Sequence, residues 1–207
     1  MSDRICLFGA GGHGRVVAGQ IKARLPQTDI CFGDAQKPVG STVNGCSVEF
    51  ATPQVVRDAR LIVTIGDNAL RARLQQAAIE AGVPMAVFIA DPDRYFAEPP
   101  GEGSMVLAGA VVNSDARIGA GVIVNSGAII EHDCAIDVFC HLAPGCILAG
   151  DTVLGACVFV GAGARIVNQA RITARTVIGA GATVIRDITE PGIYAGTPAR
   201  RIAALPG

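Results

Sequence analysis

Two of the three histidines in this chain lie in the segment IIEHDCAIDVFCHLAPG, residues 129–145. His132 stands between Glu131 and Asp133, and His141 follows nine residues later. An imidazole accepts protons near neutral pH, and a carboxylate bonded to its far nitrogen fixes the tautomer and stabilises the imidazolium. The pattern therefore indicates a general base at His132. Because a turn at this point can direct either neighbour toward the ring, both carboxylates are candidates for the second role.

The segment GAGGHG, residues 9–14, forms a second candidate site. Gly9, Gly11 and Gly14 match the G-x-G-x-x-G pattern where a predicted strand turns into a predicted helix, and the free N–H groups of a helix N-terminus bind phosphate. Asp34 ends the second predicted strand, where NAD-binding proteins contact a ribose hydroxyl. Only one mononucleotide half fits before the repeats begin, so we favour a ligand with a single nucleoside, such as a nucleotide-linked sugar. A tight turn without a ligand is the alternative.

A strict period of six extends along the chain from Val106 to Val184. Fourteen successive positions at this spacing are aliphatic, and the residues two places before them, from Ala110 onward, are small or of modest size. An α-helix repeats about every 3.6 residues and a half-buried strand about every two, so this period indicates short strands separated by regular turns. We therefore predict a hexapeptide β-helix with three hexads in each coil.

The N-terminal part of the chain lacks this period and alternates apolar runs with helical patterns. The expected strands cover residues 4–9, 29–34, 60–66 and 85–90, and the expected helices cover residues 14–25 and 68–82. Strands that alternate with helices form a parallel sheet. The predicted fold class is α/β plus all-β. A small Rossmann-like domain covers residues 1–95, and a β-helix domain with a C-terminal tail covers residues 96–207.

The composition narrows the possible partners. A net charge of −1 without any block of like charge disfavours binding to nucleic acid or to an anionic membrane surface. Apolar runs end well before the roughly 18 residues of a membrane span, and the N-terminus has a strand pattern, so we expect a soluble, cytoplasmic protein. Seven cysteines without a CxxC pair argue against a disulfide framework. Cys134, Cys140 and Cys146 fall at inward positions of the repeat, which favours packing over redox chemistry.

The combination of these parts resembles a known family. GAGGHG in a short Rossmann-like domain precedes a β-helix that carries EHD, a histidine nine residues after the first, and YAGTPARRI at residues 194–202. This arrangement is similar to that of the bacterial nucleotide-sugar acetyltransferases that make bacillosamine and perosamine derivatives, and of the sialic acid O-acetyltransferases. The resemblance covers essentially the whole chain. It implies a homotrimer of left-handed β-helices that uses acetyl-CoA, transfers the acetyl group between neighbouring β-helices and binds the nucleotide on the N-terminal domain.

The resemblance also implies roles for particular residues. His132 corresponds to the catalytic base, and Asp133 corresponds to the carboxylate that raises its basicity. His141, Ala162 and Ala180 correspond to positions along acetyl-CoA. The expected contacts of the nucleotide-linked sugar are Gly11, Gly12, His13, Gly33, Asp34 and Gly66. The implied reaction moves the acetyl group of acetyl-CoA directly, without an acyl-enzyme, to the amino group of a nucleotide-linked amino-deoxy sugar of the UDP-4-amino or GDP-perosamine type.

Three other interpretations stay open at this point. The same base can activate a hydroxyl, as in O-acetylation of the sialic acid type. A non-catalytic, trimeric nucleotide-binding scaffold would use the β-helix for trimerisation alone. The γ-class carbonic anhydrases share the β-helix and hold zinc with histidines, but catalytic zinc commonly takes three protein ligands and this β-helix offers two histidines. We therefore expect no metal. The resemblance implies acetyl-CoA as a co-substrate.

Overall fold

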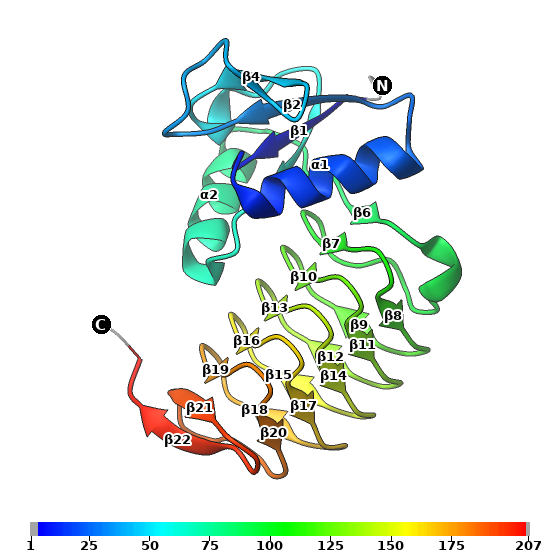
Figure 1. The fold of residues 1–207 in the computed structure, drawn as a ribbon, viewed down its shortest axis with the longest axis vertical. Helices are drawn as coiled ribbons and strands as arrows, with labels where there is room; N and C mark the ends of the chain where they lie inside the picture. Colours follow the sequence, from blue (N-terminus) through cyan, green and yellow to red (C-terminus); the bar gives the residue numbers. More distant parts are fainter. Residues whose placement is uncertain (1–3, 206–207) are drawn as a thin grey trace.

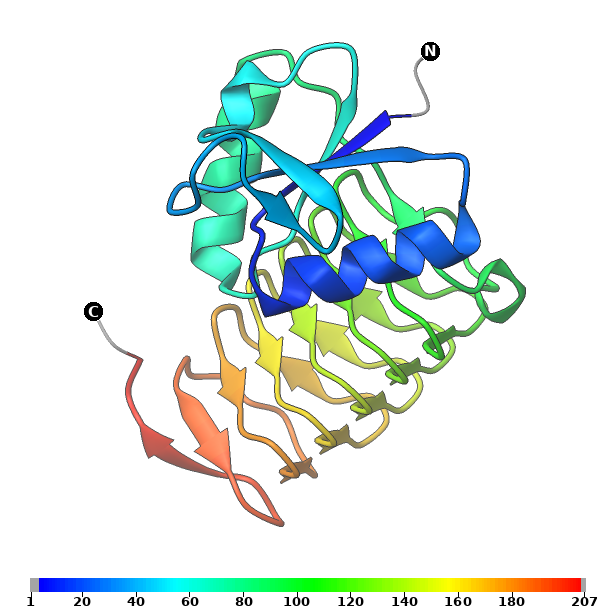
Figure 2. The ribbon, with the colours of Figure 1, turned by 45° about the horizontal axis from the view of Figure 1, so that its top comes forward.

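The computed structural model describes residues 4–205. An N-terminal α/β domain covers one end and one side of a prism of stacked strand coils, and the chain ends in a hairpin at the other end of the prism (Figure 1). Helix α1, Gly12–Arg24, lies between the N-terminal sheet and the coils (Figure 2). The fold is a Rossmann-like unit followed by a left-handed parallel β-helix, which confirms the predicted fold class. The helices within residues 4–205 are too short or too polar to span a membrane.

The N-terminal sheet is built from short apolar runs, which suit parallel strands buried on both faces. Its strands are β1 (Arg4–Phe8), β2 (Asp29–Gly33), β3 (Thr42–Val43), β4 (Cys46–Phe50) and β5 (Arg60–Val63). Strands β4, β2, β1 and β5 lie parallel in that order, and β3 pairs antiparallel with β4 at the edge. A 3-10 turn, Pro53–Val55, precedes β5, and helix α2, Asn68–Glu80, follows it. The sequence pattern predicts β1, β2, β5 and both helices, but not the β3–β4 hairpin.

The strand expected over residues 85–90 is divided between the two sheets. Met85 forms an isolated bridge with Leu61 beside the N-terminal sheet. Strand β6, Phe88–Ile89, pairs instead with β7, Met105–Val106, on the prism. Met85 and Phe88 are both buried, so the apolar run carries no sign of the change of sheet. The first strand of the prism therefore lies before residue 96.

Three parallel sheets form the faces of the prism. Face 1 contains β6, β7, β10 (Ile123–Val124), β13 (His141–Leu142), β16 (Phe159–Val160), β19 (Val177–Ile178) and β21 (Ile193–Ala195). Face 2 contains β8 (Val111–Val112), β11 (Ile129–Ile130), β14 (Ile147–Leu148), β17 (Arg165–Ile166) and β20 (Thr183–Val184). Face 3 contains β9 (Arg117–Ile118), β12 (Ala135–Ile136), β15 (Val153–Leu154) and β18 (Arg171–Ile172). Between β7 and β20 each strand pairs with the strand three hexads later, as between Ile123 and His141, which is the register that the six-residue period predicts.

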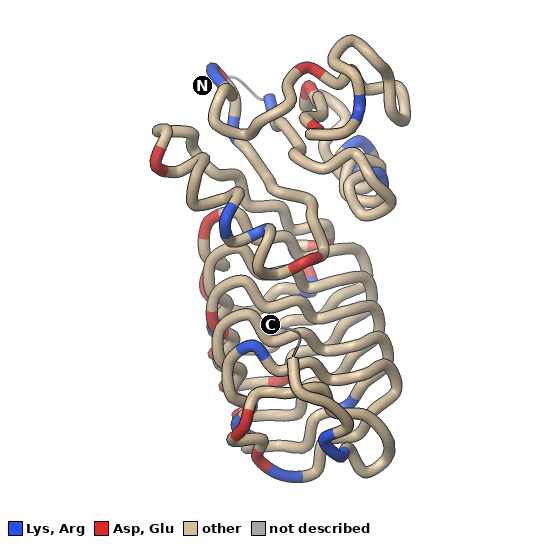
Figure 3. The backbone as a smooth tube through the Cα atoms, turned by 90° about the vertical axis from the view of Figure 1, so that its left-hand side faces the viewer, with Lys and Arg blue, Asp and Glu red and all other residues tan. Residues whose placement is uncertain are grey.

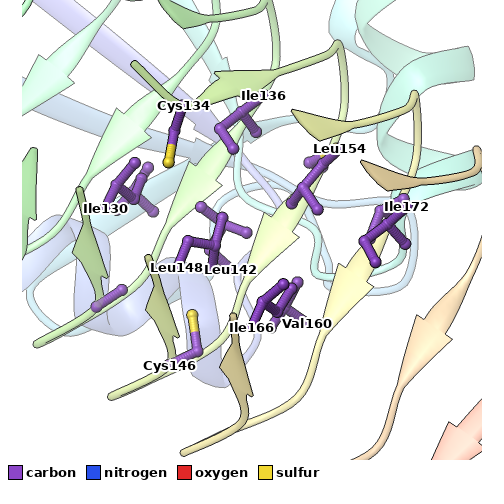
Figure 4. Packing of buried hydrophobic residues seen from close by; sticks show 14 of the residues in the cluster. Ile130, Cys134, Ile136, Leu142, Cys146, Leu148, Leu154, Val160, Ile166 and Ile172 are labelled. Atoms are coloured by element: carbon purple, nitrogen blue, oxygen red, sulfur yellow. The ribbon is translucent and has the colours of Figure 1, made fainter. Parts of the chain in front are cut away.

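The inward positions of the repeat form one continuous apolar core. Every aliphatic position of the period from Val106 to Val184 is buried in a single cluster. Figure 4 shows these side chains stacked from coil to coil, with Cys134 and Cys146 among them. The cysteines Cys134, Cys140 and Cys146 are fully buried there, as the packing interpretation predicts. Short aliphatic side chains suit this narrow interior, because large rings do not fit at the same place in every coil.

The coils turn at corners where the backbone is left-handed. At the corner between faces 2 and 3 these residues are Asp115, Asp133, Asp151 and Gln169, with φ values from 57° to 64°. Aspartate tolerates this conformation better than most residues with a side chain. Charged residues are sparse over most of the coils and gather along one edge of the prism (Figure 3). The corner directly follows His132 and so holds this residue on the outside of the prism.

Helix α2 fixes the N-terminal domain to the prism. Arg71 is 0% exposed, and its guanidinium donates to the carbonyl oxygens of Gly121, Phe139 and Cys140 on the prism and of Ile65 in the N-terminal domain. Side chains one turn before and one turn after it on α2 bond to carbonyl oxygens of other coils. Burial lowers the pKa of Arg71 to about 10, so the group stays charged at neutral pH. The junction is therefore polar and buried, and its guanidinium is satisfied by hydrogen bonds.

The C-terminal strands end the prism. Strand β21 pairs parallel with β19, and β22, Arg200–Ala203, folds back to pair antiparallel with β21. All four residues of β22 are exposed. The last coil is thus covered on face 1 by a hairpin instead of by another repeat.

We expect Leu142→Ala to destabilise the protein by about 2–5 kcal/mol, because it leaves a cavity in the column of inward side chains. Val39→Ala is the control, since Val39 is 60% exposed and its loss opens no cavity. Urea unfolding at one fixed protein concentration measures both variants. Equal midpoints for the two would contradict the packed interior.

Candidate active site

The imidazole of His132 lies outside the prism, beside the corner between faces 2 and 3. Its Nδ1 is 2.8 Å from Oδ2 of Asp133, and the two side chains are 64% and 59% exposed. A carboxylate in this place accepts the Nδ1 proton as a hydrogen bond and leaves the lone pair of Nε2 free. The pair can therefore accept a proton at Nε2 from a group that approaches through solvent.

The corner conformation decides which of the two carboxylates reaches the ring. Asp133 has a φ of 61°, which breaks the alternation of the strand and brings its side chain back to His132. Glu131 lies before the corner, and its Oε2 accepts a hydrogen bond of 2.9 Å from Nδ2 of Asn113, one coil earlier. The structure thus pairs His132 with Asp133.

The charges around His132 make it a stronger base. The hydrogen bond to Asp133 raises the pKa of His132 above its ordinary value of 6.5, and the charges of Glu131 and Asp151 act in the same direction. A base works only in its neutral form, which predominates above its pKa. A reaction that uses His132 as a base must therefore accelerate as the pH rises through this raised pKa.

A second pair of histidines lies where the N-terminal domain meets face 1. His141, on β13, is 8% exposed; its Nδ1 donates to the Gly66 carbonyl oxygen at 3.1 Å, and its Nε2 accepts from Nδ2 of Asn125 at 3.1 Å. His13 approaches from the glycine-rich loop, and the centroids of the His13 and His141 rings are 6.0 Å apart. The structure therefore brings together His13, Gly66 and His141 from three distant parts of the sequence.

These two imidazoles are neutral at pH 7. Burial lowers the pKa of His13 and that of His141 to about 4, and the charge of Arg71 acts in the same direction on both. Nε2 of His13 is buried and has no hydrogen-bond partner within residues 4–205. A buried nitrogen in this state is a ready contact for a polar ligand.

A pocket of about 630 Å³ opens at the carboxyl ends of the N-terminal strands, which is where α/β sheets bind ligands. Its lining includes Gly11, Gly12, His13, Asp34, Thr64 and Gly66. Helix α1 begins at Gly12, so the free N–H groups of its first turn belong to this lining. Such a pocket suits an anionic ligand, and the binding of a nucleotide-linked sugar here stays a prediction.

The glycines of the motif are needed for different reasons. A Cβ on Gly14 would overlap the carbonyl oxygen of Gly9, so Gly14 allows α1 to pack against the loop. A Cβ on Gly11 or on Gly12 would meet none of the described atoms within 4 Å. These two glycines border open space in the pocket and leave it free for a ligand.

Asp34 shapes the glycine-rich loop, a role that the sequence pattern does not reveal. Its Oδ2 accepts a bond of 2.8 Å from the backbone N–H of Ala10, and its Oδ1 accepts bonds of 2.8 Å and 3.1 Å from those of Gln36 and Lys37. Partial burial opposes ionisation, but these backbone bonds lower the pKa of Asp34 overall. The carboxylate thus ties the loop after β1 to the turn after β2.

Gly33 supports the glycine-rich loop through a backbone hydrogen bond and through packing in the sheet. It is buried, and a Cβ there would overlap the ring of Phe50. Its carbonyl oxygen accepts a hydrogen bond of 2.8 Å from the backbone N–H of Gly9. The contact expected between Gly33 and a nucleoside stays a prediction, whereas its packing role is evident.

Ala162 and Ala180 lie on successive coils at the corner between faces 1 and 2. Both are exposed, and the Ala162 carbonyl oxygen accepts a hydrogen bond of 2.8 Å from the backbone N–H of Gly181. They form an accessible edge of small residues next to face 1. Nothing in their side chains obstructs a long ligand along this edge.

The predicted site residues form two groups within one chain. His132 and Asp133 lie at the corner between faces 2 and 3, whereas the pocket, His13 and His141 lie on the side of face 1. In a triangular prism that corner is opposite face 1, so one chain does not bring the two groups together. Within residues 4–205 no cluster of three histidine, cysteine or acidic side chains is arranged to hold a metal ion.

Two polar residues of the junction escape prediction from the sequence. Arg71 lies in an ordinary amphipathic helix pattern, where an arginine is normally exposed. Asn125 resembles a turn residue of the repeat, yet its amide donates to His141. The sequence offers one signal for Arg71 and Asn125: each lies near a segment that contains candidate site residues.

Comparisons with known proteins agree with this architecture. The PglD N-terminal domain family matches residues 4–78. The acetyltransferase domain of PglB from Neisseria gonorrhoeae, solved with acetyl coenzyme A, is 32% identical with a TM-score of 0.87, and the match covers 98% of this chain and 100% of that one. A histidine mutant of perosamine N-acetyltransferase from Caulobacter crescentus, solved with CoA and GDP-perosamine, is 33% identical over 96% of both chains with a TM-score of 0.86.

A third structure, WeeI from Acinetobacter baumannii, shares the fold at 23% identity and a TM-score of 0.84, over 96% of this chain and 99% of that one. The search of curated proteins gave no match. The matches to the PglB domain and to the perosamine enzyme cover both the N-terminal domain and the β-helix of this chain. The chain belongs to the hexapeptide-repeat sugar acetyltransferases with a PglD-type N-terminal domain.

We expect Asp34→Ala to loosen the glycine-rich loop without unfolding the sheet. It removes the acceptor of three backbone hydrogen bonds, each worth on the order of 1 kcal/mol. Amide hydrogen exchange should accelerate about fivefold or more at Ala10, Gln36 and Lys37. Asp93→Ala, which removes an exposed carboxylate elsewhere, should leave these rates unchanged. Wild-type exchange at Ala10 in Asp34→Ala would refute the role.

Proposed function

We propose that this chain transfers the acetyl group of acetyl-CoA to the amino group of a nucleotide-linked amino-deoxy sugar, of the UDP-4-amino or GDP-perosamine type. The observation that carries the proposal is the exposed His132–Asp133 pair, because a sugar amine must lose a proton when it attacks a thioester. The relatives add support. The PglB domain binds acetyl coenzyme A, and perosamine N-acetyltransferase binds CoA and GDP-perosamine.

His132 acts as the general base in this reaction. The amine nitrogen attacks the carbonyl carbon of the thioester, and Nε2 of His132 takes a proton from the nitrogen. The tetrahedral intermediate then collapses, the C–S bond breaks, and the proton passes from the imidazolium to the leaving thiolate of CoA. Asp133 stabilises the imidazolium between these two steps. The products are the N-acetylated sugar and CoA, and no acyl-enzyme forms.

The nucleotide occupies the pocket on the N-terminal domain. Its phosphates lie beside Gly11 and Gly12, where the first turn of α1 supplies free N–H donors. Asp34 keeps the loop in shape, and Nε2 of His13, which has no hydrogen-bond partner among the described residues, contacts the ligand. Gly66 lines the same pocket and is bonded to His141, which joins the pocket to face 1.

A homotrimer completes the active site. The His132 corner of one protomer must reach the face 1 side of another, because these two regions lie on opposite sides of one prism. On face 2, beside that corner, Val111, Ile129 and Ile147 point outward, and each is only partly buried. This apolar row provides a surface on which a second protomer packs. Acetyl-CoA then lies in the groove between protomers, along His141, Ala162 and Ala180.

We expect His132→Ala to lower kcat by on the order of 10²–10⁴ while the fold stays intact, because the ring is exposed and its bonding partner is Asp133. Asp115→Asn alters the same corner one coil earlier and serves as the control. Release of CoA in the presence of the sugar nucleotide measures both variants. Unchanged turnover in His132→Ala would remove this residue from the mechanism, and an alkali-labile product would identify O-acetylation.

The pH dependence of kcat tests the pairing with Asp133. The hydrogen bond raises the pKa of His132, so the rate of the wild type should rise with pH at values above 6.5. Asp133→Asn weakens that bond and should move this limb of the profile to lower pH. A profile of Asp133→Asn that coincides with the wild type would show that the carboxylate does not tune the base.

We expect Gly11→Val to raise KM for the sugar nucleotide about tenfold or more and to leave the melting temperature unchanged. The new side chain meets none of the described protein atoms within 4 Å, so it acts on the ligand alone. Gly19→Ala, on the exposed side of α1, is the control. A wild-type KM in Gly11→Val would place the phosphates elsewhere.

Heterotrimers test whether the site is shared. Co-expression of His132→Ala with Gly11→Val chains creates sites in which one protomer supplies an intact His132 and its neighbour an intact loop. With random assembly about a quarter of the sites should be fully functional. The assay uses the sugar nucleotide well below the wild-type KM, where Gly11→Val trimers are slow. Under this condition, activity no higher than that of either variant alone would show that each site lies within one chain.

A further inference from the structure

Gly150 stands one coil after His132 in the column of residues at the corner between faces 2 and 3. Ser114, His132, Gly150 and Asn168 occupy equivalent places on four successive coils. Ser114, His132 and Asn168 are exposed, but Gly150 is buried. The imidazole of His132 covers it, so this outward position has no access to solvent.

Gly150 leaves room for the ring, and its backbone conformation does not require a glycine. A Cβ on Gly150 would lie 2.6 Å from Cε1 and 2.7 Å from Nε2 of His132. A Cβ atom does not approach a non-bonded heavy atom this closely, so any side chain at position 150 would displace the ring. The φ of Gly150 lies outside the left-handed region in which glycine is favoured.

We propose that Gly150 is a positioning residue for His132: its missing side chain lets the imidazole lie against the following coil, where Nδ1 meets Asp133 and Nε2 keeps a fixed place beside the prism. The inference rests on the proposed function of His132 as the base. An exposed histidine otherwise samples several rotamers, whereas proton transfer needs a fixed distance to the reacting nitrogen. The hydrogen bond to Asp133 restrains one side of the ring, and the contact with Gly150 restrains the other.

The free protein permits a direct test, because His132 titrates apart from the other two histidines. The pKa values of His13 and His141 are lowered to about 4, and the pKa of His132 is raised above 6.5 by Asp133, Glu131 and Asp151, the charged groups that face it. NMR titration of the imidazole Cε1–H signals therefore measures His132 without any substrate. We expect Gly150→Ala to move the pKa of His132 down toward 6.5, since the displaced ring loses its short bond to Asp133.

Steady-state kinetics provide the second readout. Gly150→Ala should lower kcat about tenfold to a hundredfold, because a small displacement of a base has an effect of this size. KM for the sugar nucleotide and for acetyl-CoA should stay within about twofold, since neither binding region includes position 150. Gly19→Ala controls for a glycine-to-alanine change in open surroundings, and Asn168→Ala controls for a change in the same column one coil further on.

The outcomes separate this inference from the proposed function. A titration curve and a kcat equal to those of the wild type overturn the positioning role. If Gly150→Ala also lowers the melting temperature, the same change in a His132→Ala background decides. Because the double variant lacks the ring, it should have the same melting temperature as His132→Ala. A lower melting temperature would show that Gly150 is needed for the backbone fold and not for the ring. Absence of acetyl transfer by the wild type would reject the proposed function and leave the NMR test valid.

Discussion

The buried guanidinium of Arg71 is the interaction on which the relation between the two domains depends. It donates to carbonyl oxygens on both sides of the junction, from Ile65 beside the pocket to Phe139 and Cys140 just before His141. A charge without exposure to water is tolerated only where such bonds are complete. Because the same carbonyl groups flank Gly66 and β13, this side chain, together with its neighbours Asn68 and Gln75 on α2, fixes how the ligand pocket faces the prism. The bond between His141 and Gly66 depends on that placement.

The prism and the loop domain make different contributions to chemistry. The interior of the prism is a column of aliphatic side chains that repeats from coil to coil. Every corner of the prism therefore has a fixed position along the axis and a fixed direction. The prism therefore presents the exposed His132–Asp133 pair without a flexible loop to carry it. The pocket of the N-terminal domain has no such repeating core. It is formed by glycines that border open space and by a carboxylate that binds backbone N–H groups. In the proposed trimer, the shared site joins the rigid prism of one chain to the glycine-rich pocket of another.

The sequence predicts most of the fold because its signals are periodic. The six-residue spacing from Val106 to Val184 predicts which side chains point inward, and the apolar runs predict β1, β2 and β5. Signals that depend on a single backbone angle are not periodic. The choice between Glu131 and Asp133 follows from the left-handed corner at Asp133, and the division of residues 85–90 follows from packing between two sheets. The burial of Arg71 is likewise set by tertiary contacts that leave no local pattern.

The hairpin of β21 and β22 has a consequence for solubility. A ladder of identical parallel coils has no natural end, and its last strand would offer unpaired backbone groups to any other chain with the same repeat. β22 reverses direction, begins with two arginines and stays fully exposed, so an incoming parallel strand meets both the wrong polarity and a positive charge on that face. The terminal hairpin therefore hinders the addition of a further parallel strand at the face 1 end of the prism.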